Sequence, residues 1–398
     1  MGQTKSLGLK ENAGLFSLLV LMSAFVGTMV GFERSLLPEL TKDWELSSLE
    51  ASLLMVAVFG ASKAVANLLT GKLISDIGRK RTLILGWLIA LQAPLILLHA
   101  SSGWLIILAN IALGLSQGFT WSTTVMMKID IVGLAKRGTA MGLNESAGYL
   151  AVGGSSFAGA YYVHENGMLA PVLYGALGIG LIATIFAVFL VPDTQPWVDL
   201  EHKLHTVIPP VKSDNIFLHT SFKEAKLRNI TWAGLVNNAN DGVLWAILPF
   251  LLITQGSPLT LVGWLTGIHA SVWGMGQLIT GPLSNKGDLK VLIISGMVIQ
   301  GCSLLAIGYN PVLILPYILL GAGTAMVYPT FLVGISNNSH PSWRPKAMSA
   351  YRFWRDMGYV VGALLGFVAL QFGQAHTAFY GIALLTLLTA GIFWRGYR

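Results

Sequence analysis

One apolar stretch near the end of the sequence carries charged side chains at a spacing that suits solute binding. Arg352, Arg355 and Asp356 lie in Ala350–Phe367, a segment that is otherwise apolar. With Tyr359 they fall at i, i+3, i+4 and i+7, so a helix would carry them as one polar stripe. A charge inside the hydrocarbon of a bilayer is costly unless it faces protein or water. The stripe is therefore a functional candidate if the segment crosses a membrane.

Other polar side chains interrupt apolar runs in the same manner. Fixed cations favour an anionic or carboxylate-bearing solute, amides can hydrogen-bond to it, and aromatic rings can stack on it. The candidates for solute binding are Lys63, Arg352, Arg355, Asn237, Asn240, Asp241, Trp273 and Tyr359. The candidates for carrying a proton are Glu145, Asp241 and Asp356, because a desolvated carboxyl group can hold a proton near neutral pH.

A purely structural role is the alternative for each of these groups. Arg352 and Arg355 could neutralise buried acids and so hold two parts of the protein together, and asparagines can join helices by hydrogen bonds. Lys63 has the strongest case for function among the bases. The only acid on its own predicted helix, Glu50, lies more than about three turns away.

The composition places these charges in a membrane protein. The chain has 398 residues, of which 54% are hydrophobic and 11% charged, and its mean hydropathy is +0.66. Runs of roughly 20 apolar residues, enough for a helix to cross about 30 Å of hydrocarbon, recur along it. We predict an all-α membrane protein with twelve transmembrane helices, at 14–37, 50–70, 82–100, 103–125, 139–162, 170–192, 229–254, 259–281, 290–308, 311–335, 347–371 and 376–395.

Lysine and arginine are distributed unevenly between the breaks that separate these helices. Both termini and every second break hold nearly all of them, including Lys128 after the fourth helix, whereas the remaining breaks hold Lys42 alone. By the positive-inside rule both termini are predicted to be cytoplasmic, and we expect a bacterial inner membrane. The net charge of +7 then requires no nucleic-acid partner. Cys302 is the single cysteine, which excludes an internal disulfide.

The two halves of the sequence repeat one another. AGYLAVGG (Ala147–Gly154) aligns with MGYVVGAL (Met357–Leu364), and further matches occur at nearly the same sequence offset. Six helices separate the copies, so the copies share one orientation in the membrane. The alignment places Glu145 at the position that corresponds to Arg355, so these two side chains could face each other; the alternative is that Asp356 pairs with Arg355. The predicted division is a first half at 1–192, a cytoplasmic linker at 193–228 and a second half at 229–398.

The break after the second predicted helix, GKLISDIGRKRTL (Gly71–Leu83), resembles a loop of the major facilitator superfamily. The family reads Gly-x-Leu-x-Asp-x-x-Gly-Arg-Lys/Arg there, and the sequence departs from it where Ser75 stands at the Asp position and Asp76 follows. The resemblance covers essentially the whole chain. It implies twelve helices in two six-helix repeats, with this loop as a cytoplasmic latch. Arg79 could pair with Asp130 at the cytoplasmic end of the fourth helix; the alternative is that Arg79, Lys80 and Arg81 only determine the topology. The gating residues that it implies are Gly71, Asp76, Gly78, Arg79 and Asp130.

Together these features predict a secondary active transporter that moves a small solute by alternating access about a site near the midplane. Proton coupling and an anionic or carboxylate-bearing substrate are favoured. The alternative is a proton-coupled drug or metabolite exporter. The resembled exporters have a Gly-Pro in the fifth helix, and AGYLAVGGSSFAG (Ala147–Gly159) lacks it.

Motifs of other protein classes are missing. The sequence has neither a Gly-x4-Gly-Lys-Ser/Thr loop nor a His-Glu-x-x-His motif, so a nucleotide-driven pump and a zinc enzyme are not expected. An intramembrane enzyme or a receptor is the weaker alternative of another class. We expect no cofactor and no metal. The expected partners are the solute, protons and the lipid bilayer, and the expected state is a monomer.

Overall fold

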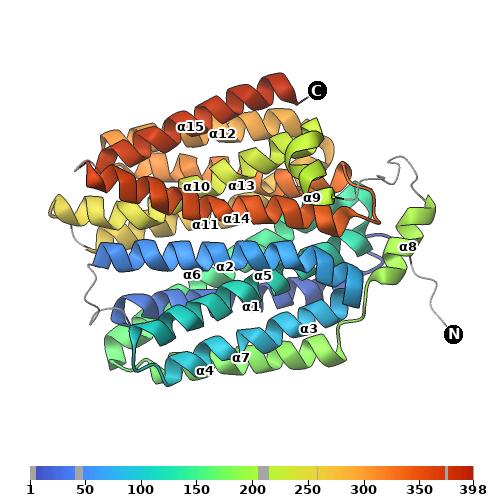
Figure 1. The fold of residues 1–398 in the computed structure, drawn as a ribbon, viewed down its shortest axis with the longest axis horizontal. Helices are drawn as coiled ribbons and strands as arrows, with labels where there is room; N and C mark the ends of the chain where they lie inside the picture. The colour runs from blue at the N-terminus through green and yellow to red at the C-terminus, as the bar shows by residue number, and fades with distance from the viewer. Residues whose placement is uncertain (1–5, 41–47, 205–214, 258, 373–374, 398) are drawn as a thin grey trace.

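Helices make up the elements of the computed structural model, which describes residues 6–40, 48–204, 215–257, 259–372 and 375–397 (Figure 1). The first half contains α1 (Ala13–Leu40), α2 (Ser48–Ile77), α3 (Arg79–Ala90), α4 (Gln92–Leu98), α5 (Gly103–Val132), α6 (Arg137–Asn166) and α7 (Ala170–Phe189). The short helices α8 (Gln195–Leu204) and α9 (Ile216–Leu218) lie in the connection to the second half. The second half contains α10 (Ala225–Thr254), α11 (Leu259–Lys286), α12 (Leu289–Tyr309), α13 (Ile314–Asn337), α14 (Arg344–Gln371) and α15 (Ala375–Gly396).

Every predicted membrane span coincides with a helix of the described ranges. The third span consists of α3 and α4, which Leu91 separates, and each of the others is a single helix. Several helices extend further than predicted: α2 continues to Ile77 and α5 to Val132. The prediction of an all-α membrane fold in two six-helix repeats is confirmed.

Most of these helices are apolar enough to cross a bilayer on composition alone. Nine spans in the described part of the chain satisfy this condition. The exceptions α6, α10 and α11 are equally long but carry glycines and polar residues along their length. These helices contact other helices closely, so their polar groups can be satisfied by protein rather than by lipid.

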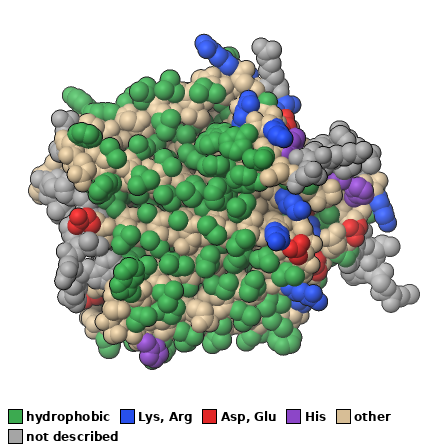
Figure 2. All heavy atoms as spheres, in the orientation of Figure 1, with side chains coloured by type: hydrophobic (Ala, Val, Ile, Leu, Met, Phe, Trp, Pro, Cys, Tyr) green, Lys and Arg blue, Asp and Glu red, His purple; other side chains and the backbone are tan. Residues whose placement is uncertain are grey.

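The outer helices of the bundle present apolar side chains. In Figure 1, α3, α4 and α7 form one edge of the molecule and α12 and α15 the other. Phe189 on α7 and Ile392 on α15 are 77% and 65% exposed, which suits contact with lipid. Figure 2 shows hydrophobic side chains over most of this face of the molecule, with lysine and arginine gathered at one end.

The charged end of the bundle also holds α8, and we call it the α8 end (Figures 1 and 2). The start of α1 lies there, because Trp197 Nε1 of α8 donates to Asn12 Oδ1 over 3.0 Å. The last residues of α15 lie at the same end (Figure 1). We call the opposite end the far end. Lys42, the single base predicted in the breaks of the opposite side, lies outside the described residues.

The two halves touch through α2 with α14 and through α6 with α11. A Cβ added at Gly60 of α2 would lie 2.8 Å from the Cβ of Tyr359 on α14. A Cβ added at Gly281 of α11 would lie 2.7 Å from the Cα of Gly142 on α6. Gly142 and Gly281 belong to the parts of their helices near the α8 end, so the halves approach closely there.

The contact of α10 with α14 depends on glycine, which gives a first prediction. A Cβ added at Gly362 of α14 would lie 2.5 Å from the carbonyl oxygen of Ala239, so Gly362→Ala must push the helices apart and should cost about 1–3 kcal/mol. The thermal unfolding temperature of the purified protein measures this. Gly153→Ala is the matched control, because Gly153 is exposed and no heavy atom lies within 4 Å of its added Cβ. Equal unfolding temperatures for the two variants would contradict the close contact.

Candidate functional site

Asp356 of α14 is a shared acceptor at the centre of the bundle. Its Oδ2 lies 3.8 Å from Nζ of Lys63 on α2 and also accepts a hydrogen bond from Asn67. Its Oδ1 accepts from Nε of Arg355 over 2.7 Å and from Nδ2 of Asn238 on α10 over 3.3 Å. The acid is fully buried, so these groups from three helices replace the water that it lacks.

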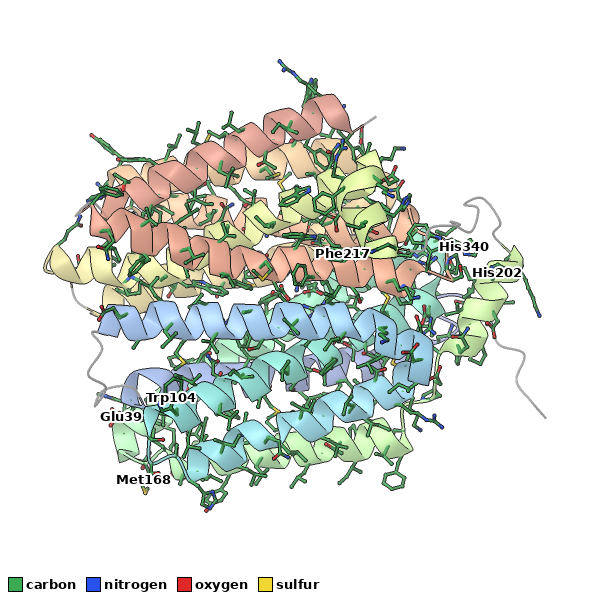
Figure 3. All side chains as sticks on the ribbon, in the orientation of Figure 1. Glu39, Trp104, Met168, His202, Phe217 and His340 are labelled. Carbon is green, nitrogen blue, oxygen red and sulfur yellow. The ribbon has the colours of Figure 1, made fainter. Side chains whose placement is uncertain are left out.

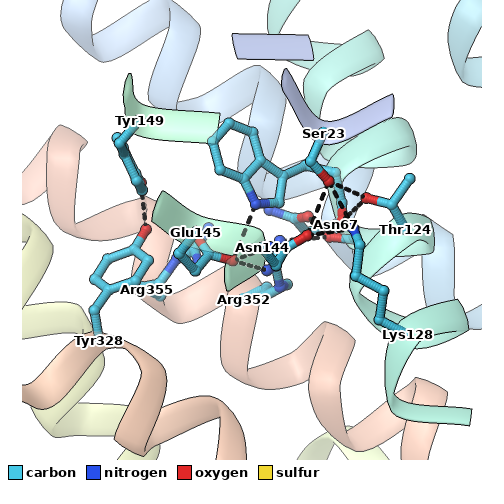
Figure 4. Close-up of polar contacts among 12 residues, drawn as sticks. Ser23, Asn67, Thr124, Lys128, Asn144, Glu145, Tyr149, Tyr328, Arg352 and Arg355 are labelled. Atoms are coloured by element: carbon cyan, nitrogen blue, oxygen red, sulfur yellow. Dashed lines mark hydrogen bonds and ion pairs between the residues drawn. The ribbon is translucent and has the colours of Figure 1, made fainter. Parts of the chain in front are cut away.

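Glu145 of α6 is the second buried acid of this centre (Figure 4). Its Oε1 lies 3.4 Å from Nη2 of Arg352, and it accepts hydrogen bonds from Trp121 Nε1 over 3.1 Å and Asn144 Nδ2 over 2.6 Å. Its Oε2 has no partner among the described residues. The acid therefore joins the first half of the molecule to α14 and keeps one oxygen unused.

The partner of Glu145 differs from the expected one, whereas the alternative partner of Arg355 is confirmed. Arg355, which the repeat places opposite Glu145, bonds to its own neighbour Asp356, and Arg352 reaches Glu145 instead. Arg352 Nη1 also donates to Ser122 over 3.1 Å. The two arginines share one face of α14, and Arg352 lies about one turn nearer the α8 end than Arg355. Repeat alignment alone does not show which of these two levels faces Glu145.

Aromatic rings surround the charged centre and connect the two halves. The ring of Tyr149 on α6 lies 3.8 Å from that of Trp273 on α11, centroid to centroid. The hydroxyl groups of Tyr149 and Tyr328 on α13 are 2.7 Å apart, and Arg355 Cζ lies 5.2 Å from the Tyr328 ring. The predicted binding residues Trp273 and Arg355 thus belong to one cluster, together with Tyr149, which the sequence analysis did not select.

Lys63 is held by rings rather than by hydrogen bonds. Its Nζ lies 5.7 Å from the ring centroids of Phe59 and Trp121 and 5.8 Å from that of Tyr359. The side chain is 3% exposed, and in the described part of the chain its ammonium makes no hydrogen bond. Cation–π attraction stabilises such a charge but uses none of its three N–H donors. Lys63 is therefore able to donate to a bound anion.

Two predicted binding residues, Asn237 and Asn240 of α10, lie in contacts between helices. Asn240 Nδ2 donates to Gln300 Oε1 of α12 over 2.7 Å, and Gln300 Nε2 donates to Asn237 Oδ1 over 3.0 Å. Thr386 of α15 donates to Asn240 Oδ1 over 2.7 Å. This network favours the alternative in which these asparagines join helices by hydrogen bonds.

Asp241, the next residue of α10, has a different environment. Its Oδ1 lies 3.3 Å from Nε2 of His269 on α11, and its Oδ2 has no partner among the described residues. Both side chains are almost fully buried. His269 did not stand out in the sequence, because a single histidine in an apolar run resembles a core residue.

Lys128 is a further buried base, and its position corrects the prediction that it lies in a cytoplasmic break. The residue belongs to α5 and is fully buried. Its Nζ donates to Ser23 Oγ over 2.8 Å and to Asn144 Oδ1. Asn144 in turn donates to Glu145, so Lys128 belongs to the same polar network as Glu145 (Figure 4).

The predicted latch is present in part. Arg79 Nε at the start of α3 lies 3.2 Å from Asp130 Oδ2 on α5, as predicted. Gly78 has φ = 87°, which favours glycine. Asp76 is exposed and makes no ion pair or hydrogen bond among the described residues. Asp193 instead accepts from the backbone N–H of Lys80 over 3.0 Å.

Gly71 of α2, also assigned to the latch, packs against α14 rather than against the loop. A Cβ at this position would lie 2.6 Å from Ser349 Oγ. A larger residue would separate α2 from α14 at the α8 end, so the glycine permits the two halves to close together there.

A buried ion triad at the α8 end was missed by the sequence analysis. Glu201 of α8 accepts two hydrogen bonds of 2.8 Å from Arg344 at the start of α14 and another from Arg137 at the start of α6. Arg137 Nη1 also donates to the carbonyl oxygen of Ser336 over 3.3 Å. We call Arg137, Glu201 and Arg344 the α8 clamp. It holds the first half, the connection and the second half together.

The clamp sets the ionisation of its acid. Burial alone would raise the pKa of Glu201, but the hydrogen bonds and charge of Arg344 and Arg137 lower it below its ordinary value of 4.5. His202 and His340 lie beside the clamp with ring centroids 4.9 Å apart (Figure 3). Burial, with His202 and Arg344 nearby, lowers the pKa of His340 from 6.5, so this ring is neutral at pH 7.

Known proteins resemble this chain over most of its length. The family model described as Major Facilitator Superfamily matches residues 16–236 and 230–398. The multidrug resistance protein MdtG of Salmonella arizonae is 23% identical over 339 residues, which cover 83% of this chain and 79% of that protein.

Two solved structures share the fold. The human organic anion transporter MFSD10 superposes with a TM-score of 0.81 at 15% identity, covering 95% of this chain and 98% of that one. The proton:xylose symporter XylE superposes with a TM-score of 0.73 at 14% identity, covering 96% of each chain. At these identities the likeness concerns the fold alone.

The α8 clamp gives a second prediction. Breaking a buried ion pair costs about 3–5 kcal/mol, and about 1.4 kcal/mol is already a tenfold change in an equilibrium. In a Cys302→Ser background, maleimide labelling of Ser336→Cys should therefore be at least about tenfold faster when Glu201→Gln is added. Ser336 is 1% exposed and contacts Arg137, so its labelling reports opening of the α8 end. Asp199→Asn, on the exposed side of α8, is the control.

The pH dependence of the same labelling follows from the lowered pKa of Glu201. A carboxyl whose folded pKa lies below its ordinary value stabilises fully above that value, here 4.5, and this contribution is lost as the pH falls through the folded pKa. Because maleimide reacts with the thiolate, both labelling rates fall in acid, so the quantity to compare is their ratio. The ratio of the Glu201→Gln rate to the parent rate should be constant from neutral pH down to about 4.5 and approach one in stronger acid. A ratio that grows as the pH falls would contradict this sign.

Proposed function

The chain belongs to the major facilitator superfamily, and on this premise we propose that it moves an anionic or carboxylate-bearing solute by alternating access, coupled to protons. It is a transporter that binds a small molecule within the membrane, and not an enzyme. The solute, the coupling ion and the roles of individual residues are our proposal, and the geometry of the buried bases supports it.

The observation that carries the proposal is the state of Lys63 and Arg355. Both are buried bases of the centre. The Lys63 ammonium makes no hydrogen bond among the described residues, and Nη1 of Arg355 is buried without a partner there. Donors left unpaired in a low-dielectric interior cost free energy, which an anion that accepts from both would recover. Asp356 lies beside both bases, so an arriving carboxylate would compete with it.

Closure of the α8 end supports alternating access. The α8 clamp and the α6–α11 glycine contact join the halves at that end. While the α8 end is closed, the centre can open toward the opposite end. Breaking the clamp would favour the state in which the α8 end is open. The lysines and arginines at the α8 end (Figure 2) support a cytoplasmic location for it and for both termini. We propose a monomer in a bacterial inner membrane, divided at 1–192, 193–228 and 229–398.

Glu145 is the proposed proton carrier. Its Oε1 contacts Arg352 and accepts hydrogen bonds from Trp121 and Asn144, whereas its Oε2 has no partner among the described residues. A buried oxygen in this state could take a proton, and a protonated acid would release Arg352. Asp356 and Asp241 are the other carboxyls predicted to carry a proton, but both oxygens of Asp356 already have partners.

The similarity to a multidrug resistance protein favours a second candidate function, export of drugs or metabolites in exchange for protons. The aromatic cluster of Tyr149, Trp273 and Tyr328 would suit an apolar solute. The two candidates differ in whether the solute must carry an anionic group.

The first test of the proposal removes the two bases. Lys63→Ala and Arg355→Ala should each lower transport of an anionic substrate by at least about a hundredfold, because each removes a charged donor worth roughly 3 kcal/mol in the interior. Uptake and efflux in proteoliposomes over a panel of carboxylates measure the effect. Lys290→Ala, at the surface beside Trp394, is the control. Normal transport of anions by both variants would place the anion site elsewhere.

The second test concerns coupling. Glu145→Gln should transport down a solute gradient but lose its response to an imposed pH gradient, because the amide cannot exchange a proton. The comparison is solute accumulation by proteoliposomes with and without the pH gradient. If Glu145→Gln responds as the parent does and Asp241→Asn alone loses the response, coupling belongs to α10.

A further inference from the structure

Three buried side chains form a row on α11, and each has a polar atom with no hydrogen-bond partner in the described ranges. His269, Trp273 and Gln277 are four residues apart and at most 1% exposed. The unpaired atoms are His269 Nδ1, Trp273 Nε1 and both amide atoms of Gln277. Each unpaired buried group costs about 1–3 kcal/mol, and native structures contain few of them. A row of them indicates a surface that receives a ligand.

Asp241 of α10 adds an acid to this row. Its Oδ1 lies 3.3 Å from His269 Nε2, whereas its Oδ2 is buried and unpaired. A neutral imidazole that donates from Nε2 has an acceptor at Nδ1, so the pair offers two unused acceptors and one negative charge. Glu145 and Asp356 have arginine or lysine within ion-pair distance. Within the described ranges, Asp241 has only His269.

Aromatic rings connect this pair to the anion-binding bases. The rings of His269 and Trp273 are 6.0 Å apart, and those of Trp273 and Tyr328 are 5.2 Å apart, centroid to centroid. The Tyr328 ring lies 5.2 Å from Cζ of Arg355. An acid with one unpaired oxygen therefore stands at one end of this group of rings, and a base with an unpaired donor stands at the other.

We propose that the Asp241–His269 pair is a second subsite of the transport site and binds a protonated amine. The substrate is then a zwitterion with a carboxylate at Arg355, an ammonium at Asp241 and an apolar, planar part along Trp273 and Tyr328. The inference rests on the proposed function, because it takes the carboxylate at Arg355 from there. A zwitterion supplies donors to the unpaired acceptors and an acceptor to the unpaired donor, and it adds no net charge to the interior.

Three rigid probes of similar shape test the amine subsite and the anion site separately. 4-(Aminomethyl)benzoate carries an ammonium and a carboxylate, 4-methylbenzoate carries the carboxylate alone, and 4-methylbenzamide carries no charge. Their dissociation constants would be measured by calorimetry on the purified full chain in lipid nanodiscs. We expect 4-(aminomethyl)benzoate to bind at least tenfold more tightly than 4-methylbenzoate, and 4-methylbenzoate more tightly than the amide.

The variant Asp241→Asn tests the subsite itself. Asparagine has the same size as aspartate and can still accept from His269, but it carries no charge. The dissociation constant of 4-methylbenzoate divided by that of 4-(aminomethyl)benzoate should fall from at least ten to about one in Asp241→Asn. The same ratio should stay high in the surface variant Lys290→Ala. Thermal unfolding checks that each variant is folded. If Asp241→Asn does not fold, the comparison of probes on the parent chain still decides the question.

The outcomes distinguish this inference from the proposed function. Equal affinities for the two carboxylates, with the amide weaker, would overturn the amine subsite and leave the anion site intact. Equal affinities for 4-methylbenzoate and the amide would overturn the anion site. A high ratio that survives Asp241→Asn would place the amine elsewhere and so overturn the assignment. Absence of binding by all three probes at millimolar concentration would overturn both.

Discussion

The buried carboxylate of Asp356 is the interaction on which the centre of the molecule depends. It binds Lys63 and Asn67 of α2, Asn238 of α10 and Arg355 of its own helix. Inside a bilayer no water is available to replace a lost partner, so these groups must satisfy one another. The two halves of the protein therefore share one set of ion pairs and hydrogen bonds at the centre of the molecule.

The centre and the α8 clamp are connected by rigid elements. α6 carries Arg137 of the clamp and Glu145 of the centre, and α14 carries Arg344 and Arg352. In each helix the two residues are about 12 Å apart along the axis. A rotation that separates α6 from α14 at one level must also change their separation at the other. This arrangement offers a physical route by which a substrate at the centre could affect the ion pairs of the α8 clamp.

Hydropathy was sufficient to place the membrane spans, because the need to bury about twenty apolar residues leaves a strong local signal. The Arg79–Asp130 pair was also predictable, because Arg79 lies in the loop motif and Asp130 at the end of the fourth helix on the same side of the membrane. The position at which α5 ends was not predictable, because Lys128 resembles a loop residue in the sequence but is buried against Ser23 and Asn144. Glu201 gave no signal, because a polar linker helix acquires its partners only when both halves assemble around it. The pairing of Glu145 with Arg352 likewise depends on how α6 and α14 are rotated against each other.

The position of Glu201 in the connection between the halves has a consequence for how the α8 clamp forms. The acid is on the same chain as both arginines, 64 residues from Arg137 and 143 residues from Arg344. Formation of the clamp is therefore an intramolecular step that does not depend on protein concentration. The connection is a third component that cannot diffuse away from the two halves.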